Sequence, residues 1–304
     1  MCQRERALKK ITQGLLTRTH ISPIVAQNHY SSVAQDGELQ RMAKRPVIGL
    51  NMSIELIDKY EKYGLLVPLG YIDAVDGAGG LPLCVPPIPD MAFLRESISL
   101  LDGIVLIGGD DYRPEHYGGH AQPENELMHE RRDRFDLELA KLALQENTMP
   151  VLGICGGHQL LSIAQGGALV QDIATEWDVP ADCPPLPHAK KERNEEQNRD
   201  FRHPVRLGAG SIVERTLQIP SGTMLMVNST HHQSVHPLKI GRSLRASAWS
   251  ADGVIEAIEP SLDSPWARSG RFVLGVQWHP EQLQEEEAHR NIFRALIEAA
   301  QQRI

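Results

Sequence analysis

Residues 151–167 read Val-Leu-Gly-Ile-Cys-Gly-Gly-His-Gln-Leu-Leu-Ser-Ile-Ala-Gln-Gly-Gly, and this stretch decides the fold prediction for the chain. Its first four residues form an unbroken apolar run that is typical of a strand buried on both faces. A cysteine and two glycines follow, and a helical pattern begins directly behind them. The order strand, Gly-x-Cys-x-Gly, helix is typical of a nucleophile elbow, a sharp turn that lifts one side chain above the sheet.

Cys155 is the residue that such a turn would present. Glycines two positions before it and two positions after it leave room for the turn. The helix behind it points its N-terminus at the sulfur, which favours the thiolate form. An arbitrary cysteine is more often a buried core residue. The flanking glycines at this spacing nevertheless favour a nucleophile.

Short apolar runs alternate with helical patterns around this stretch. Strands are expected at residues 46–50, 81–85, 104–107 and 151–154, and helices at residues 68–80, 91–101 and 131–147. This alternation predicts an α/β fold with a mostly parallel central sheet flanked by helices. Ligands bind such sheets at the carboxyl ends of the strands, where Cys155 and the pair Gly108-Gly109 both fall.

The pattern changes in the C-terminal half. Residues 174–202 are rich in proline and charge and are expected to form a surface loop. Short strands are then expected at residues 205–207, 224–227, 244–249, 254–258 and 272–278, before a last helix at 285–300. They predict a smaller antiparallel β section. We expect residues 46–304 to form a single domain.

Composition excludes several classes of function. A net charge of −8 argues against non-specific binding of nucleic acid. No apolar run approaches the ~18 residues that a membrane span needs. The four cysteines, at positions 2, 84, 155 and 183, have neither disulfide-framework nor metal-site spacing. We therefore expect a cytoplasmic protein that binds no membrane.

Residues 1–45 differ from the rest of the chain. They hold eight Lys/Arg against three Asp/Glu, a net charge of +5. No apolar core of a secretory signal is present, and three acidic residues weaken the case for a transit peptide. Met42 stands close before the first strand and would be a natural start. We interpret residues 1–45 as a basic extension that is poorly ordered or not translated.

His279 is the strongest candidate for the base that a nucleophilic cysteine needs. It follows the apolar run 272–278 and begins the sequence His-Pro-Glu. In extended geometry Glu281 would point the same way and could hold the imidazole tautomer. His-Pro-Glu alone is also compatible with a surface turn. For the oxyanion, the backbone N–H groups of Gly109 and Gly156 are the candidate donors.

A second polar cluster, Asn-Ser-Thr-His-His-Gln, occupies residues 228–233. Its donors and acceptors suit a polar, charged small molecule. A metal site made of His231, His232 and His236 is disfavoured because no acidic residue or cysteine stands at ligand spacing. We expect neither a metal nor a cofactor.

The motif Gly-Ile-Cys-Gly-Gly-His-Gln together with the distant His-Pro-Glu resembles the class I glutamine amidotransferase superfamily. From residue 46 to the C-terminus the chain resembles one branch, the gamma-glutamyl-gamma-aminobutyrate hydrolase family. The resemblance is carried by Gly-Gly-Leu-Pro at 79–82, Gly-Gly-Asp-Asp-Tyr-Arg-Pro-Glu-His-Tyr at 108–117, Asp-Arg-Phe-Asp-Leu-Glu at 133–138, residues 150–172, Val-Asn-Ser-Thr-His-His-Gln at 227–233, Asp-Gly-Val-Ile-Glu-Ala-Ile-Glu at 252–259 and Leu-Gly-Val-Gln-Trp-His-Pro-Glu at 274–281.

The resemblance implies hydrolysis of a small gamma-glutamyl amide through a glutamyl thioester. It assigns Cys155 as nucleophile, His279 as the proton carrier and Glu281 as the group that orients it, with the oxyanion held by Gly109 and Gly156. By the same resemblance, the glutamyl head group would be contacted by Gln159, Asn228, Ser229 and His231.

Two positions depart from that branch, which often has Arg and Met where this chain has Gly156 and His158. The sequence Cys-x-Gly-His-Gln is closer to the glutaminase domains of biosynthetic amidotransferases. The alternative function is therefore a glutaminase subunit that passes ammonia to a separate synthase partner. The sequence names neither the released amine nor the oligomeric state, for which a homodimer is one option.

Overall fold

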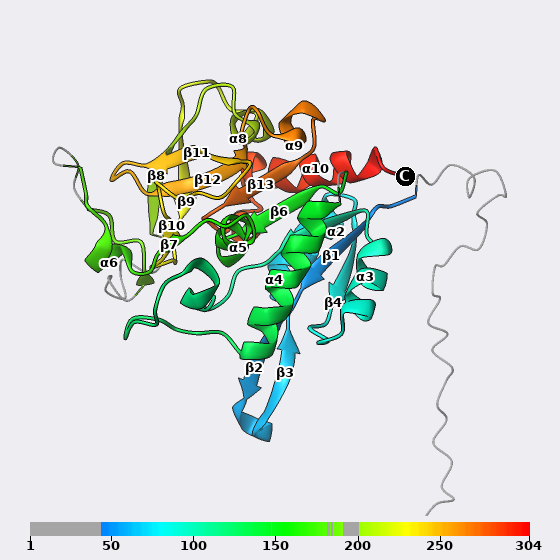
Figure 1. Ribbon diagram of the computed structural model, residues 1–304. Coiled ribbons are helices and arrows are strands. Elements are labelled where there is room, and N and C mark those ends of the chain that lie inside the picture. The colour runs from blue at the N-terminus through cyan, green and yellow to red at the C-terminus, as the bar shows by residue number, and fades with distance from the viewer. Residues whose placement is uncertain (1–43, 147, 181–182, 184, 191–200) are drawn as a thin grey trace, which may run out of the picture. The chain divides into compact units, whose positions relative to one another are not determined.

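A nine-stranded sheet with the order β4-β1-β5-β6-β13-β12-β11-β8-β9 organises the chain (Figure 1). The computed structural model describes residues 44–304 except 147, 181–182, 184 and 191–200. The prediction for residues 1–45 therefore lies almost wholly outside the described residues, and the single domain at 46–304 stays a prediction.

One half of the sheet is parallel. Its strands are β4 (Leu81–Val85), β1 (Val47–Asn51), β5 (Gly103–Leu106), β6 (Val151–Ile154) and β13 (Val273–Val276). The carboxyl ends of the last three strands lie next to one another, since β6 pairs with β5 on one side and with β13 on the other. This places the segments after them at one edge of the sheet.

The other half is antiparallel and continues from β13 within the same sheet. It consists of β12 (Ile255–Pro260), β11 (Leu244–Ser250), β8 (Arg202–Leu207) and β9 (Met224–Asn228). The short strands β7 (Leu169–Val170) and β10 (Ser234–Val235) form a separate pair. The predicted fold class, a mostly parallel sheet with a smaller antiparallel section, is confirmed.

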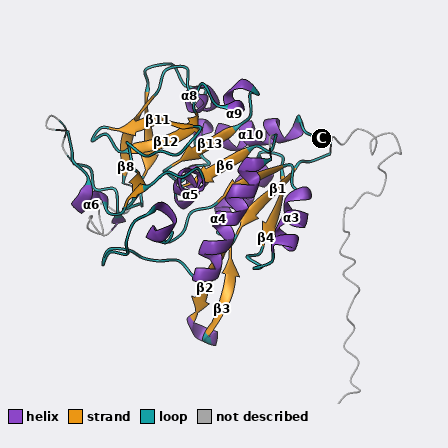
Figure 2. Cartoon of the chain, viewed as in Figure 1, coloured by secondary structure: helices purple, strands orange, loops and turns teal. Residues whose placement is uncertain are grey.

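Helices cover both faces of the sheet (Figure 2). One face packs against α3 (Met91–Ser99), α4 (Glu130–Gln145) and α5 (Gly156–Ala164), and the other against α2 (Leu69–Gly77), α8 (Ile212–Leu217) and α10 (Glu287–Gln301). Successive residues of a strand point to opposite faces, so Ile104 and Leu106 of β5 join the first layer and Val105 joins the second.

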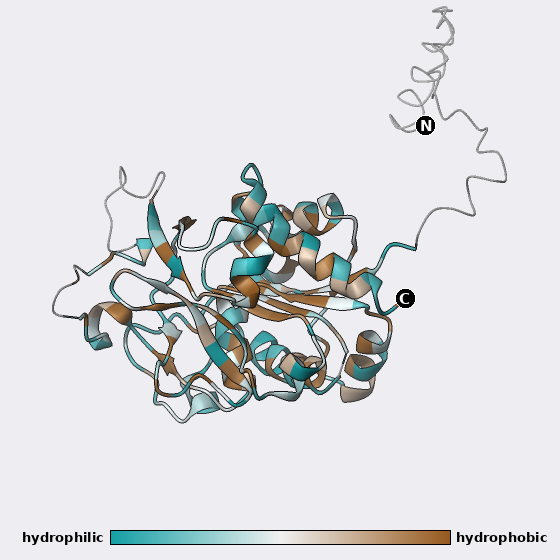
Figure 3. Cartoon of the chain, turned by 90° about the horizontal axis from the view of Figure 1, so that it is seen from above, coloured by the Kyte–Doolittle hydropathy of each residue, from teal (hydrophilic) through white to brown (hydrophobic). Residues whose placement is uncertain are grey.

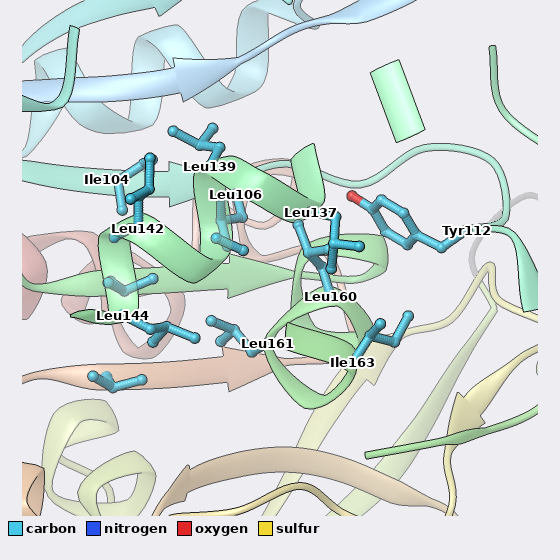
Figure 4. Packing of buried hydrophobic residues seen from close by; sticks show 14 of the residues in the cluster. Ile104, Leu106, Tyr112, Leu137, Leu139, Leu142, Leu144, Leu160, Leu161 and Ile163 are labelled. Carbon is cyan, nitrogen blue, oxygen red and sulfur yellow. The ribbon is translucent and has the colours of Figure 1, made fainter. Parts of the chain in front are cut away.

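The apolar strands therefore lie between two layers of amphipathic helices, as Figure 3 shows. Figure 4 shows the first layer from close by, with Leu139 and Leu142 of α4 near Ile104, and Leu160 and Leu161 of α5 below them. These side chains are at most 8% exposed. A layer that is this tightly packed fixes the position of α5, and with it the turn at Cys155.

Two features depart from the sequence prediction. A hairpin of β2 (Ser53–Ile57) and β3 (Lys62–Leu66), joined by η2 (Asp58–Tyr60), extends away from the main sheet and was not predicted. The prediction that residues 174–202 form a surface loop is wrong for His188 and Ala189, because both are buried.

Four short elements complete the described part of the chain: η3 (Pro114–Tyr117), α6 (Ile173–Glu176), α9 (Pro265–Arg268) and η5 (Pro280–Gln282). Among the described residues, no helix has both the length and the apolar character that crossing a membrane requires.

Candidate active site

Cys155 occupies a strained turn between β6 and α5. Its φ of 51° and ψ of −108° lie in a region that non-glycine residues rarely adopt. A Cβ atom on Gly153 would lie 2.5 Å from the Gly157 carbonyl oxygen, and one on Gly157 would lie 2.0 Å from the Leu106 carbonyl oxygen. Glycine at both positions is therefore a steric requirement of the elbow.

His279 and Glu281 lie beside this turn. His279 and Cys155 both lie against Gly108, where a Cβ atom would come 3.2 Å from Cε1 of His279 and 3.3 Å from Cβ of Cys155, and Nδ1 of His279 lies 2.7 Å from Oε1 of Glu281. The expected extended geometry is wrong, because Pro280 begins the 3-10 turn η5 and Glu281 reaches back from within that turn. Cys155, His279 and Glu281 are nevertheless brought together in the order that a nucleophile, a base and an orienting acid require.

Glu281 determines the charge of His279. Burial opposes the imidazolium form, but the Glu281 carboxylate and Cys155 together raise the pKa of His279 well above its usual value. With Nδ1 held by Glu281, Nε2 is the nitrogen that can exchange a proton with the thiol. The arrangement can hold a proton close to the sulfur and release it later.

Tyr71 and Asn228 fix the ring and the backbone of His279. The sequence did not indicate Tyr71, and it predicted a substrate contact for Asn228. The Tyr71 hydroxyl lies 3.5 Å from His279 Nδ1 and accepts a hydrogen bond from the Gly108 N–H. The Asn228 side chain accepts from the His279 N–H at 2.9 Å and donates to the His279 carbonyl at 3.3 Å. Asn228 is thus engaged with the backbone of His279.

The predicted oxyanion donors are close together. The position of a Cβ on Gly156 lies 3.4 Å from the Gly109 nitrogen. Neither amide donates a hydrogen bond to another described residue. A Cβ on Gly109 would lie 2.1 Å from Nη1 of Arg132, so only glycine fits above that guanidinium.

Arg132 is a site residue that sequence reasoning missed. It is 2% exposed and donates to the Gly108 carbonyl at 2.7 Å, to the Ser53 hydroxyl at 2.6 Å and to Asp136 at 3.1 Å. Holding the Gly108 carbonyl orients the peptide whose N–H belongs to Gly109. The available signal was a charged residue on the buried side of an amphipathic helix.

A pocket of about 430 Å³ opens over the sulfur. Cys155, His279 and Gly109 line one part of it, and Glu126, Thr230, His232, Ala189 and Lys190 line the rest. Nε2 of His232 lies 3.0 Å from Asp111. The pocket therefore offers both positive and negative groups to a polar ligand.

The four predicted substrate contacts are buried or engaged within the protein. Gln159 donates to the Gln233 carbonyl at 3.2 Å, and the Ser229 hydroxyl donates to the His188 carbonyl at 3.0 Å. His231 and Asn228 likewise contact protein groups. None of the four lines the described pocket. Their contact with a substrate stays a prediction.

His158, whose identity departs from the resembling branch, is fully buried beneath the elbow against Gly275. It does not line the pocket. Gln277, which the sequence did not single out, donates weakly to the Cys155 sulfur at 3.7 Å.

The fold separates the three histidines of the disfavoured metal site. His232 lies between Asp111 and Asp172, and His236 accepts from the Leu238 N–H. His231 instead meets two histidines and a glutamate from distant parts of the chain. Spacing along the sequence could not have revealed this group.

Comparison with known proteins identifies relatives along most of the chain. The chain is 32% identical over 295 residues to a Rickettsia prowazekii (strain Madrid E) protein assigned as glutamine amidotransferase-like, covering 85% of this chain and 99% of the relative. It is 30% identical over 271 residues to the gamma-glutamyl-gamma-aminobutyrate hydrolase PuuD of Escherichia coli (strain K12), covering 88% and 98%.

A solved structure has the same fold. A Thermoplasma acidophilum protein assigned as one of the subunits of GMP synthase superposes with a TM-score of 0.53 at 16% identity, over 84% of this chain and 94% of that one. The model of the Peptidase C26 family matches residues 46–281. The chain therefore belongs to the Peptidase C26 family.

Proposed function

We propose that this protein hydrolyses the gamma-amide bond of a small gamma-glutamyl amine, releasing glutamate and the amine. Membership of the Peptidase C26 family makes the chain a glutamine amidotransferase-like hydrolase. The observation that carries the finer proposal is the gathering of Cys155, His279 and Glu281 at a polar pocket that Cys155 and His279 line, with Glu281 hydrogen-bonded to His279.

The first half of the reaction forms a thioester. His279 takes the proton of Cys155, and the sulfur attacks the gamma-carbonyl carbon of the substrate. The negative charge on the carbonyl oxygen is stabilised by the N–H groups of Gly109 and Gly156. His279 then donates its proton to the nitrogen of the leaving amine, and the C–N bond breaks.

The second half releases glutamate. His279, now neutral, takes a proton from a water molecule that attacks the thioester carbon. The C–S bond breaks, and the thiol is restored when the proton returns to sulfur. Glu281 keeps the imidazole in the same tautomer through both halves.

The pocket suits a glutamyl head group, which carries an α-ammonium and an α-carboxylate. Glu126 is a negative group on the lining and Lys190 a positive one. The similarity to the E. coli gamma-glutamyl-gamma-aminobutyrate hydrolase supports this substrate class.

A panel of gamma-glutamyl amides of aminobutyrate, polyamines, amino acids and anilines tests the proposal, with glutamine as the control. We expect steady release of glutamate from at least one gamma-glutamyl amine by the isolated protein, and little from glutamine. Hydrolysis of glutamine alone, and only with a synthase present, would instead assign the chain as a glutaminase subunit.

A further inference from the structure

His188, His203, His231 and Glu256 form a buried cluster, and none of the four lines the active-site pocket. All four side chains are at most 4% exposed, and their nearest ligand atoms all lie within 4.8 Å of one another. Oε1 of Glu256 lies 3.7 Å from Nδ1 of His188, 3.5 Å from Nε2 of His203 and 3.8 Å from Nε2 of His231. Three imidazoles thus surround one carboxylate.

The cluster joins four separate parts of the fold. His203 lies on β8 and Glu256 on β12, two strands of the antiparallel half that do not pair with each other. His231 follows β9, and His188 belongs to the segment before residue 190. Each of the four parts brings one ligand-type side chain to the same point.

Hydrogen bonds fix the tautomers of two of these imidazoles. Nε2 of His188 lies 3.1 Å from Oδ2 of Asp252, and Nδ1 of His231 lies 3.0 Å from the Gln233 carbonyl oxygen. Each of these nitrogens faces an acceptor and therefore carries the proton. The other nitrogen of each ring then presents a lone pair toward Glu256. This outer arrangement, with a carboxylate or carbonyl behind the imidazole, is the one that metal-ligating histidines show.

The polar atoms at the centre of the cluster are poorly supplied with donors. Both carboxylate oxygens of Glu256 and Nε2 of His231 are buried without a hydrogen-bond partner among the described residues. The Ser229 hydroxyl lies 3.4 Å from Nδ1 of His188. A buried carboxylate and buried lone pairs that face one another are costly unless a cation or proton lies between them.

We propose that His188, His203, His231 and Glu256 bind one Zn²⁺ ion. Three imidazole nitrogens and one carboxylate oxygen are a zinc ligand set, and nitrogen donors disfavour Ca²⁺ and Mg²⁺. Tetrahedral bonds of about 2.0–2.1 Å place ligand atoms roughly 3.4 Å apart. The separations of 3.5–3.8 Å from the carboxylate oxygen need to contract by a few tenths of an ångström, and the wider separations within the cluster, which lie within 4.8 Å, by up to about 1.4 Å.

The site is structural because its four ligands close the coordination sphere and none of them lines the active-site pocket. Its role is to hold one wall of that pocket. His188 is followed directly by Ala189 and Lys190, which line the pocket, and Ser229 donates to the His188 carbonyl. The ion ties this segment to β8 and β12.

The test measures zinc bound by the full chain carrying Cys155→Ala, which removes the thiol as a competing ligand. Zinc content is determined after equilibration with Zn²⁺ and removal of loosely bound metal. We expect one ion per chain. Replacement by Co²⁺ is expected to give the visible absorption of a four-coordinate site with nitrogen and oxygen ligands.

Substitutions of the proposed ligands are compared with a substitution of a buried histidine outside the cluster. His203→Gln combined with Glu256→Gln is expected to abolish binding of the ion, whereas His289→Gln, which changes another fully buried histidine, retains it. Asp252→Asn removes the negative charge behind His188 and is expected to weaken zinc binding by about 10–100-fold.

Two outcomes overturn the proposal. One is a folded Cys155→Ala chain that takes up no stoichiometric zinc and gives no cobalt spectrum. In that case the four side chains share protons and bind no metal ion. The other is zinc that remains in the double variant. Because the cobalt spectrum is read on a chain with all four ligands intact, the proposal stays testable where the double variant does not fold. Both readouts are independent of hydrolysis, so their failure is distinct from failure of the proposed function.

Discussion

Two histidine–glutamate pairs in this molecule have opposite electrostatics. His279 lies 2.7 Å from Glu281, and His231 lies 3.8 Å from Glu256. Burial opposes the charged form of both imidazoles. At His279 the Glu281 carboxylate overcomes it and raises the pKa well above the usual value, whereas at His231 burial and the neighbouring His188 lower the pKa well below it.

The difference lies in what surrounds the carboxylate. Glu281 is committed to one ring, so a single proton is shared along a hydrogen bond. Glu256 faces three imidazoles, and burial, with Asp252 and Cys155 nearby, raises its pKa well above the usual value. The first pair is suited to moving a proton. In the second, burial favours the neutral form of His231, which is the form in which histidine binds a metal ion.

The largest expected effect is at Cys155, the proposed nucleophile. Cys155→Ala is expected to lower kcat/KM for gamma-glutamyl amides by at least about 10⁴-fold, because no other group can form the thioester. Steady-state release of glutamate measures it. Cys84→Ala, which changes an exposed free thiol, is the control and should leave the rate unchanged. Equal rates for Cys155→Ala and the original chain would refute the mechanism.

Glu281→Gln tests the hydrogen-bonded pair of His279 and Glu281 directly. The amide keeps the size of the side chain but removes the charge that stabilises the imidazolium and its tautomer. We expect kcat to fall by roughly 10²–10⁴-fold. The apparent pKa of His279 in the pH–rate profile should also fall, since Glu281 raises it.

The exposed Glu285, four residues further along the chain, supplies the matched control, Glu285→Gln. A pH–rate profile that is identical in the Glu281→Gln variant and in this control would show that Glu281 does not set the charge of His279.

His158 extends the comparison to a fully buried histidine without a carboxylate partner. Burial lowers its pKa to about 4. The unfolded chain, with a histidine pKa of about 6.5, therefore binds the proton first as the pH falls, so acid reduces the stability of the folded state between these two values. Across this pH interval the free energy of unfolding falls by roughly 3 kcal/mol, since each pH unit contributes about 1.4 kcal/mol.

His158→Gln should remove this part of the acid sensitivity. Free energies of unfolding, measured by denaturant titration at several pH values from neutral to pH 4, test it. His120→Gln, at an exposed histidine, is the control. An unchanged slope in His158→Gln would contradict the assigned protonation.

The smallest effect is expected at Asn228. Because this side chain bonds both to the N–H and to the carbonyl of His279, Asn228→Ala should lower kcat by about tenfold with little change in KM. Met226→Ala, at a partly exposed position of the same strand, is the control. A rise in KM at constant kcat would instead support the substrate contact that the family resemblance implies.

The part of this site that the sequence predicts is the part encoded locally. The elbow follows from two glycines that flank Cys155, and the strands before Cys155 and His279 follow from apolar runs. These features need no knowledge of which elements meet. Glu281 lies beside His279, although the turn that brings it there is not the extended geometry expected.

The unpredicted part depends on contacts between distant elements. Arg132 supports Gly109 only because α4 packs across the sheet next to the end of β5. His188 looked like part of a polar surface loop, and nothing near it in sequence indicates that it meets Glu256. The helical pattern places Arg132 on a buried face, but it does not say which groups Arg132 contacts, and His188 has no such pattern, so only the assembled sheet reveals these partners.

The strained turn at residue 155 separates what the fold needs from what the chemistry needs. Gly153 and Gly157 cannot accept a side chain, because their neighbours' carbonyl oxygens occupy the space. Cys155 itself has a φ of 51° that glycine would adopt without strain. Stability alone would therefore favour glycine at all three positions, so the proposed catalysis, and not the fold, accounts for the cysteine.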